Sequence, residues 1–426
     1  MQMNVVAADG KREYEFLDRL KERARQAGSE VEAVVRGILS DIAARGDEAL
    51  REYMLKFDGT DQLVRLDREA MQAACERVDP DFLEALKRAR ENVAAFHRAQ
   101  LKEGYELKDG VCLLGQKVRG LDRVGIYVPG GTAAYPSSVL MNAIPAKLAG
   151  VSELIMVTPP GGAKDEILAA ACLCGVDEIL LMGGAQAVGA LAYGTESVRR
   201  VDKIVGPGNL YVATAKRLIF GVCDIDMVAG PSEILILADR TADPAFIAAD
   251  LMSQAEHDRQ ASAILLTTDA GVAERTAKEI ERQIAGLSRA DIIRESLQNY
   301  GGIILCPHEQ KMLELCNYIA PEHLELMTER PLDLLDGVEN AGSVFLGQYS
   351  PEPLGDYFAG PNHVLPTGGT ARFFSPLSVD SFLKKTQYIF YSREALKEAA
   401  PYIERLAESE GLTAHANAVR VRKDRA

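Results

Sequence analysis

The chain has 426 residues, of which 47% are hydrophobic and 26% charged, with a formal net charge of −14. This length exceeds one ordinary hydrophobic core and predicts two or three domains, while the acidic balance disfavours nucleic acid and anionic membranes as partners. No apolar run approaches the ~20 residues that span a bilayer, and the start MQMNVVAADGKREYEF lacks the apolar region of a signal peptide. The composition therefore predicts a cytoplasmic protein that binds no nucleic acid and no membrane.

The two ends of the chain have a helical pattern. Apolar residues in the first ~125 positions recur three or four residues apart, which is the spacing of amphipathic helices. The clearest helix is DFLEALKRARENVAAFHRAQLKE at 81–103, and we interpret His97 within it as structural. The C-terminal segment reads as a helix followed by a basic tail.

From Val124 onward, short apolar strands alternate with helical segments. This pattern predicts parallel sheet with helices on both faces. Eight such strands could form one large sheet or two smaller ones, and GPSE at 230–233 is a plausible domain crossover because no helix separates it from the next strand. The predicted strands are 124–128, 154–158, 178–182, 202–206, 233–238, 263–267, 302–306 and 343–347.

Four of the six histidines lie in polar, turn-rich stretches, each near an acid or an amide. His323 directly follows Glu322 in APEHLEL (320–326), where Pro321 predicts a structured turn before a short strand. The other three are His257, three residues after Gln254 at a predicted helix end, His363, seven residues after Asp356 in a loop rich in glycine and proline, and His415 near the C-terminus.

These residue types allow two interpretations. Imidazole and carboxylate groups suit Zn²⁺, with an open position for substrate or water. An amide oxygen is a less usual ligand, and the chain has no H-E-x-x-H or C-x₂-C metal signature. Histidines that lie on the surface or cap helices therefore remain the alternative. The seven cysteines are scattered, mostly in apolar runs, which favours buried free thiols.

Three glycine-rich loops follow predicted strands and open helices, as anion-binding loops do. They are VPGGTAAYPSS (128–138), GGAQAVGA (183–190) and VGPGNLY (205–211). None matches G-x-G-x-x-G, since Tyr211 stands where the third glycine belongs, and ordinary turn chemistry explains such glycines about as well. The residues alone predict only that ligands bind at the carboxyl ends of these strands.

Taken together, eight ordered motifs resemble the histidinol dehydrogenase family. The resemblance implies an α/β fold with two Rossmann-like parallel-sheet domains and helical N-terminal and C-terminal tail segments, intertwined in a homodimer. The motifs are YVPGGTAAYPSSVLMNAIPAKLAGV, GGAQAVGALAYGT, KIVGPGNLYVATAKR, AGPSEILILAD, DLMSQAEHD, APEHLEL, GDYFAGPNHVLPTGGTARF and EGLTAHANAVRVR.

The implied domains follow that family. Residues 1–25 would form an N-terminal helical tail, and 26–123 together with 236–378 a discontinuous large α/β domain. Residues 124–235 would form a second Rossmann-like domain with the dinucleotide loops. Residues 379–426 would form a C-terminal tail domain that contributes to the partner's site.

The resemblance also implies a reaction, cofactors and residues. Enzymes of this family oxidise L-histidinol through L-histidinaldehyde to L-histidine, the last steps of histidine biosynthesis, and use NAD and one zinc per subunit. The implied zinc ligands are Gln254, His257, Asp356 and His415. The implied catalytic pair is Glu322 and His323. The implied substrate contacts are Ser232, Gln254, His257, His323, Asp356, His363, Glu410 and His415, and the implied NAD contacts are Tyr127, Gln186 and Asn209.

We assign roles to this pair as hypotheses. His323 would be the base for alcohol oxidation, and Glu322 would activate the water that hydrates the aldehyde. Zinc would hold the imidazole and amino nitrogens of the substrate and so orient it. Because Glu410 and His415 lie in the tail, they would complete the site of the partner subunit.

Two alternatives come from other classes of protein. One is a zinc hydrolase in which Glu322 activates metal-bound water, and the other is a non-catalytic metal- or nucleotide-binding protein. Dependence on NAD⁺ separates the dehydrogenase from the hydrolase, and the residues without the resemblance rank these two nearly level. Tolerance of Glu322→Gln and His323→Ala would indicate the non-catalytic protein.

Overall fold

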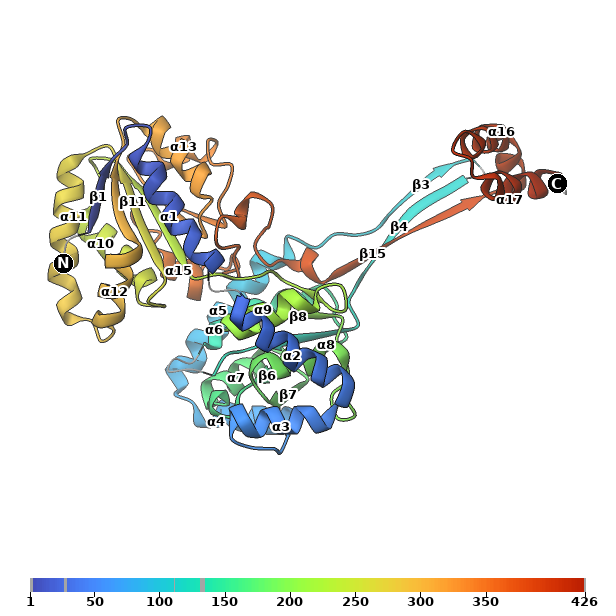
Figure 1. Cartoon of the computed structure of the whole chain (residues 1–426), viewed down its shortest axis with the longest axis horizontal. Coiled ribbons are helices and arrows are strands. Elements are labelled where there is room, and N and C mark those ends of the chain that lie inside the picture. The colour runs from blue at the N-terminus through green and yellow to red at the C-terminus, as the bar shows by residue number, and fades with distance from the viewer. Residues whose placement is uncertain (1–2, 27–28, 111, 131–134, 425–426) are drawn as a thin grey trace. The chain divides into compact units, whose positions relative to one another are not determined.

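The computed structural model describes residues 3–26, 29–110, 112–130 and 135–424 (Figure 1). The chain divides into two compact units: unit 1 comprises Met1–Gln100 and Leu121–Phe382, and unit 2 comprises Leu101–Gly120 and Leu383–Ala426. Unit 1 contains two six-stranded sheets, here called sheet A and sheet B, and unit 2 contains a three-stranded sheet and two helices. The predicted α/β class is confirmed.

Sheet A is entirely parallel, with the strand order β1-β12-β11-β10-β13-β14. The strands predicted at 233–238, 263–267, 302–306 and 343–347 lie in it, and the short strand expected after Pro321 is β13. The strands are β1 (Asn4–Ala7), β10 (Glu233–Ala238), β11 (Ser262–Thr267), β12 (Gly301–Leu305), β13 (His323–Met327) and β14 (Ser343–Leu346).

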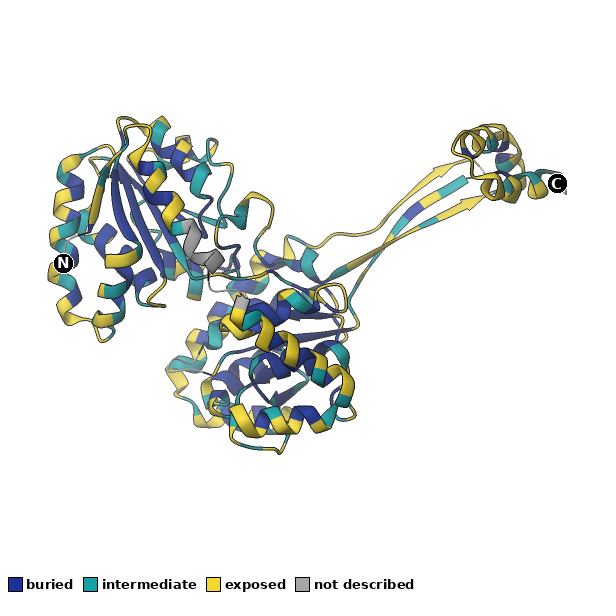
Figure 2. Ribbon diagram, in the orientation of Figure 1, coloured by how far each residue is buried: buried dark blue, intermediate teal, exposed yellow. Residues whose placement is uncertain are grey.

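Both faces of sheet A are covered, which is why its strands are apolar at successive positions. In β10, Ile234 and Ile236 join one hydrophobic core, and Leu235 and Leu237 join the other. Figure 2 shows these strands buried and the outer sides of the helices exposed. One core is covered by α10 (Pro244–Ala255), α11 (Ala270–Gln283) and α12 (Ala290–Tyr300), and the other by α1 (Arg12–Gln26), α13 (Glu309–Ile319) and α14 (Pro331–Leu335).

Sheet B has the order β2-β7-β6-β5-β8-β9, with β2 antiparallel to β7 and the other pairs parallel. It contains the other four predicted strands. The strands are β2 (Val64–Leu66), β5 (Arg123–Tyr127), β6 (Glu153–Thr158), β7 (Glu178–Leu181), β8 (Lys203–Val205) and β9 (Asp224–Ile225). The helices between them are α6 (Pro136–Leu148), α7 (Asp165–Cys174), α8 (Gly184–Tyr193) and α9 (Leu210–Ile219).

The helices before Val124 pack with sheet B, not with sheet A. Val35 and Ile42 of α2 share a hydrophobic core with Ile155 and Leu180 of sheet B, while α4 packs on α7 and α5 on α6. The family resemblance implied that 26–123 belong with 236–378, whereas the described helices of the first segment pack with sheet B. An apolar stripe shows that a helix is covered, but not by which sheet. The helices are α2 (Ser29–Arg45), α3 (Asp47–Asp58), α4 (Arg68–Arg77) and α5 (Pro80–Arg98).

Two smaller expectations concern the N-terminal part. The segment 1–25 contains α1 as expected, but it also contributes β1 to the edge of sheet A. His97 is buried in α5, with Nδ1 2.8 Å from the Val93 carbonyl oxygen, so its structural assignment is confirmed. No helix in the described ranges combines the length and apolarity needed to cross a bilayer.

Unit 2 is built from two segments that are distant in sequence. Its antiparallel sheet has the order β15-β4-β3, and β4 pairs with β15 from Cys112 to Gly120. The helical pattern expected before residue 125 was wrong for β3 and β4, and the predicted tail domain lacked these strands. The elements are β3 (Tyr105–Asp109), β4 (Cys112–Gly120), β15 (Leu383–Tyr391), α16 (Arg393–Ser409) and α17 (Thr413–Asp424).

Candidate functional site

A left-handed turn leads the chain from α13 into β13. Ala320 has φ 53° and ψ 64°, and its amide donates to the Cys316 carbonyl at 2.8 Å. Within the described part of the chain it is the one residue other than glycine with a positive φ. A left-handed alanine costs about 1–2 kcal/mol, and Pro321 fixes the next φ, so the reversal is sharp. The predicted turn is confirmed, and it puts Glu322 and His323 at the start of β13.

The Glu322–His323 pair lies at the amino edge of sheet A, where the parallel strands begin. Glu233 is the first residue of the adjacent β10, and Gln254 lies in the last turn of α10. A helix that follows a parallel strand starts at the carboxyl edge of the sheet and ends at the amino edge, so α10 returns to this side. The glycine loops had suggested ligands at carboxyl ends of strands, whereas this pair occupies the opposite edge.

The neighbours of His323 fix where its hydrogen lies. Nδ1 is 3.1 Å from the carbonyl oxygen of Glu233. Because a carbonyl oxygen only accepts, we assign the hydrogen to Nδ1 and the lone pair to Nε2. Nε2 is buried, 3.7 Å from Glu352 Oε1 and 3.9 Å from Asp356 Oδ1. Burial lowers the pKa of His323 to about 4, against the opposing Asp356 charge, so the imidazole is neutral near pH 7.

Glu322 is a buried carboxyl beside this imidazole. Its Oε2 accepts from the Glu233 amide at 2.8 Å and lies 3.6 Å from His323 Nδ1. Burial raises the pKa of Glu322 well above its ordinary value; the Glu233 amide opposes this shift, and the charges of Asp356 and Glu352 add to it. A carboxylate with a raised pKa is a stronger base. The pair therefore places a neutral imidazole beside a buried carboxyl, and a nearby cation would favour the ionised, proton-accepting form of that carboxyl.

A second acid–histidine pair lies in and after α15 (Glu352–Tyr357). His363 Nδ1 lies 3.1 Å from the Asp356 carbonyl oxygen and 3.5 Å from Asp356 Oδ1. Burial alone would raise the pKa of Asp356, but hydrogen bonding to His363 and the nearby imidazole charges lower it below its ordinary value. For Glu352, one turn earlier on α15, burial and the Asp356 charge raise the pKa to about 9. Of these two carboxyls, Asp356 is the ionised one.

Several buried polar atoms around this centre have no hydrogen-bond partner. Among the described side chains they include Gln254 Oε1, His323 Nε2 and Glu352 Oε1. His323, Glu352 and Asp356 also form a group whose possible ligand atoms all lie within 4.8 Å of one another. Unpaired nitrogen and oxygen donors among several carboxyls fit a divalent cation, which would satisfy them and favour the ionised acids.

This group overlaps the zinc ligands implied by the resemblance without matching them. Asp356 belongs to both, and the unpaired oxygen of Gln254 fits the implied set. His257, another implied ligand, is half-buried. Burial is the main cause of the lowered pKa of His323, and the nearby His257 lowers this pKa further. Sequence reasoning missed Glu352, although its spacing of four residues from Asp356 puts both on one helix face.

Two more buried carboxyls lie next to the centre and were also missed. Glu325 shares one face of β13 with His323, because strand residues two positions apart point to the same side. Glu325 Oε1 accepts from the Glu352 amide at 2.8 Å. Burial and the neighbouring Asp250 raise the pKa of Glu325, and burial raises the pKa of Asp250 to about 6. The alternation His-Leu-Glu in APEHLEL was the signal that could have found Glu325.

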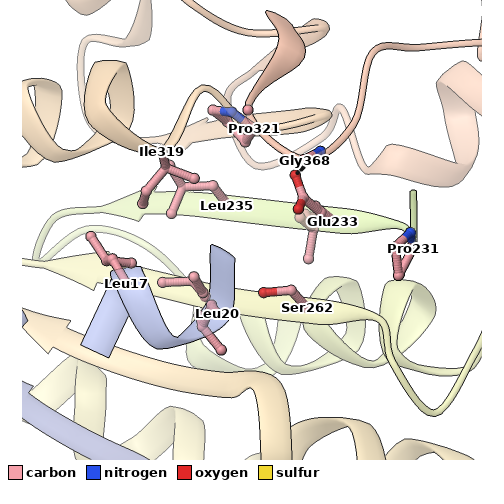
Figure 3. A pocket seen from close by; sticks show the side chains of 12 residues that line it. Leu17, Leu20, Pro231, Glu233, Leu235, Ser262, Ile319, Pro321 and Gly368 are labelled. Atoms are coloured by element: carbon pink, nitrogen blue, oxygen red, sulfur yellow. Dashed lines mark hydrogen bonds between the residues drawn. The ribbon is translucent and has the colours of Figure 1, made fainter. Parts of the chain in front are cut away.

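A small pocket opens beside the centre (Figure 3), and its lining comes from α1, β10, β11, the end of α13 and the loops around 231, 321 and 368. Glu233 lines it, and the Glu233 carboxylate accepts from the Gly368 amide at 3.2 Å. The backbone of the same residue contacts Glu322 and His323. Glu322 and His323 are not among the lining residues, so the pocket is adjacent to the centre and not part of it.

The residues implied to bind NAD all lie at the carboxyl edge of sheet B. Tyr127 is the last residue of β5, Gln186 lies in the first turn of α8, and Asn209 immediately precedes α9. This is the edge that the glycine loops predicted. Residues 131–134 of the first loop, 128–138, lie outside the described residues.

Each of these three side chains already has a partner within the protein. The Tyr127 hydroxyl accepts from the Gly184 amide at 3.0 Å, and Gln186 Nε2 donates to Asp58 Oδ2 at 3.3 Å. Asn209 Oδ1 caps α9 by accepting from two backbone amides, at 3.0 and 3.1 Å. Their contacts with NAD therefore stay predictions.

Three implied substrate or metal residues remain. Ser232 immediately precedes β10, and its carbonyl accepts from the Ser262 amide at 2.9 Å. Glu410 and His415 are exposed and belong to unit 2, at the end of α16 and in α17. The structure thus brings together Glu322, His323, Asp356 and His363, while the roles of Ser232, Glu410 and His415 stay predictions.

Fold and centre together define a class of protein: a two-sheet α/β protein with a buried acid–histidine centre. One sheet has a proton-accepting, cation-fitting acid–histidine centre, and the other has glycine loops at its carboxyl edge, where dinucleotides bind in such sheets.

Comparison with known proteins gives the family. A family model described as histidinol dehydrogenase matches residues 21–423. Histidinol dehydrogenase from Clostridium acetobutylicum is 53% identical over 412 residues, 96% of each chain, and that from Bacillus cereus is 53% identical over 424 residues, 99% of each. The crystal structure of the Elizabethkingia anophelis histidinol dehydrogenase aligns with a TM-score of 0.91 at 38% identity, covering 99% of this chain and 98% of that one. The chain belongs to the histidinol dehydrogenase family.

A cation at the acid–histidine centre should stabilise the folded chain. After chelation, Zn²⁺ at about 100 times its dissociation constant is expected to raise the free energy of unfolding by about 2.7 kcal/mol, because it binds the native state. Asp356→Asn should remove most of this gain, whereas Asp333→Asn, at an exposed acid of α14, should retain it. Thermal unfolding with and without Zn²⁺ measures both. An equal gain in Asp356→Asn and wild type would contradict this site.

Proposed function

We propose that this chain oxidises L-histidinol through L-histidinaldehyde to L-histidine, with the reduction of two NAD⁺, as the last steps of histidine biosynthesis. The observation that supports this most directly is the buried Glu322–His323 pair, in which Nε2 of His323 lies beside a cation-fitting acid group. Family membership and the glycine loops of sheet B support the substrate and the dinucleotide.

His323 and Glu322 act in different steps of the proposed reaction. In the first oxidation the carbinol carbon loses a hydride to NAD⁺ while the hydroxyl loses a proton, and His323 Nε2 accepts that proton. Before the second oxidation the aldehyde must add water. Glu322, 3.6 Å from the His323 ring nitrogen, removes a proton from that water as the carbon–oxygen bond forms. The aldehyde oxygen takes the proton held on His323 Nε2, which completes the hydrate. The hydrate then loses a hydride to the second NAD⁺ and a hydroxyl proton to His323 Nε2, which gives the carboxylic acid.

The zinc site proposed here consists of Gln254, His257, Asp356 and His415. When bound, zinc supplies a fixed positive charge that positions the nitrogens of the substrate. The unpaired buried oxygen of Gln254 supports this set. Around the metal, we propose that Ser232, His363 and Glu410, with His323 and the metal ligands, contact the substrate. Glu352 and Glu325 remain outside the set and keep the neighbouring groups in place through their hydrogen bonds.

Sheet B provides the proposed dinucleotide site. Tyr127, Gln186 and Asn209 lie at the carboxyl edge, where helices α8 and α9 begin and where open parallel sheets bind dinucleotides. All seven cysteines are free, which fits the reducing cytoplasm that we propose as its location.

We further propose that the active form is a homodimer in which unit 2 completes the site of the partner subunit. Glu410 and His415 are both exposed and belong to unit 2, whereas the other proposed zinc ligands, Gln254, His257 and Asp356, belong to unit 1. The strands that join unit 2 to the rest of the chain, β4 and β15, pair over nine residues.

The reaction is tested by following NADH absorbance with zinc-loaded protein, L-histidinol and NAD⁺. We expect two NADH per histidinol, loss of turnover after chelation, and recovery with Zn²⁺. One NADH per histidinol would contradict the hydration step. No NADH from folded, zinc-loaded protein would refute the proposed function and favour a hydrolase.

Glu322→Gln separates the two oxidations. The amide still accepts from the Glu233 backbone but takes up no proton, so oxidation of histidinaldehyde should fall by about 100-fold or more, and that of histidinol by much less. Separate steady-state assays with each substrate measure this. Glu329→Gln, at an exposed position two residues beyond β13, is the control and should retain both rates. Equal losses in both oxidations would show that Glu322 does not act in hydration alone.

Subunit mixing tests the exchange of unit 2. His415→Ala and Asp356→Ala subunits should each be inactive, and heterodimers should regain part of the activity because one of their two sites contains both wild-type residues. Activity is measured before and after subunit exchange, with self-exchanged single variants as controls. If confirmed heterodimers stay inactive, each site lies within one chain.

A further inference from the structure

A lysine–aspartate ion pair is almost fully buried in sheet B. Lys216 lies in α9 and Asp226 follows β9, and their side chains are 3% and 1% exposed. Buried charges are rare because desolvation costs several kcal/mol per ion. A gain in folding stability alone therefore seldom explains why such a pair is present. The hydrogen bonds of this pair show which backbone segment it fixes.

Both partners bind the backbone of one glycine. Lys216 Nζ donates to the Gly206 carbonyl oxygen at 2.8 Å, and Asp226 Oδ2 accepts from the Gly206 amide at 2.8 Å. The other carboxylate oxygen of Asp226 contacts Lys216 and accepts from the Met227 amide at 2.6 Å. The three residues thus form a closed ring that joins the end of β8, the segment after β9, and α9.

The glycine in this ring is required by its surroundings. Gly206 has φ 108°, in a region that side chains disfavour, and a Cβ there would lie 2.2 Å from the Tyr127 carbonyl oxygen. The loop after β8 therefore passes directly against the backbone of Tyr127. Three residues later it reaches Asn209, which caps α9. Gly206 thus anchors the loop that leads from its contact with the Tyr127 backbone to Asn209 at the start of α9.

We propose that Lys216 and Asp226 are positioning residues for the dinucleotide site, because they fix the Gly206–Asn209 loop against Tyr127. This inference rests on the proposed function, in which Tyr127 and Asn209 bind NAD. It adds two residues that do not touch the dinucleotide and act through the loop backbone. Preorganisation of this kind lowers the cost of ordering the loop when ligand binds.

A matched pair elsewhere in the same sheet provides the control. Lys147 Nζ lies 2.7 Å from Asp177 Oδ2, and that oxygen also accepts from the Leu154 amide at 2.8 Å. This pair also joins a lysine, an aspartate and a backbone amide, but its side chains are 28% and 24% exposed and Asp177 also pairs with Arg68. It lies before β7 and near the start of β6, at the amino edge of sheet B. Its loss should affect stability without affecting the dinucleotide edge.

The test uses the full-length, zinc-loaded protein and three variants: Lys216→Met, the double variant Lys216→Met/Asp226→Leu, and the control Lys147→Met. We measure NADH affinity by fluorescence titration, the KM for NAD⁺ and for L-histidinol, and the thermal midpoint. The double variant replaces both charges by apolar groups, so it should fold even if the single variant is unstable.

We expect the NADH dissociation constant and the KM for NAD⁺ to rise at least about tenfold in both Lys216 variants, a change of about 1.4 kcal/mol. The KM for histidinol should stay within about twofold, and Lys147→Met should leave all three constants near wild type. Hydrogen exchange of the amides from 205 to 212 should be faster in the Lys216 variants only. A purely structural role would not separate the two substrates in this way.

Unchanged NADH affinity in a folded double variant would overturn the proposal, and so would an equal rise in the KM for both substrates. These outcomes are distinct from a failure of the proposed function. If the wild type binds NADH but does not oxidise histidinol, the activity assignment fails, while the affinity comparison still tests the loop.

Discussion

The acid–histidine centre depends on the reversal of the chain at Ala320 and Pro321. The left-handed alanine ends α13, and the proline directs the chain into β13, so that Glu322 and His323 meet the start of the sheet. At that edge the backbone of Glu233 binds both side chains, since its amide donates to Glu322 and its carbonyl accepts from His323. One residue of the neighbouring strand thus fixes the position of the Glu322 carboxyl and the tautomer of His323.

Around this pair, burial and negative charge act in the same direction. Glu322, Glu325, Glu352 and Asp250 all have raised pKa values because they are buried, and neighbouring carboxylates raise the first three further. A site of this kind favours either protonated acids or a bound cation. Gln254 Oε1 is one more buried acceptor that has no hydrogen-bond partner among the described residues.

The two sheets of unit 1 use opposite edges. In sheet A the acid–histidine centre lies where strands begin, because the C-terminal end of α10 and the turn before β13 meet there. In sheet B the proposed dinucleotide residues lie where strands end, with helix N-termini beside them. The Lys216–Asp226 pair belongs to the second edge, and it ties the end of β8 to the helix that follows.

The sequence by itself determined eight strands of sheets A and B, the turn at Pro321 and the strand after it, the structural role of His97 and, through ordered motifs, the family. Those features depend on local apolar patterns and on residue types that neighbours in the chain control. Tertiary structure alone decided that α2 packs on sheet B, that β4 pairs with β15, and that Glu352 lies beside His323. Such contacts join segments far apart in the chain, and an apolar stripe or a lone acid does not reveal its partner. The same reason hid the ring at Gly206, whose members are ten and twenty residues away from it.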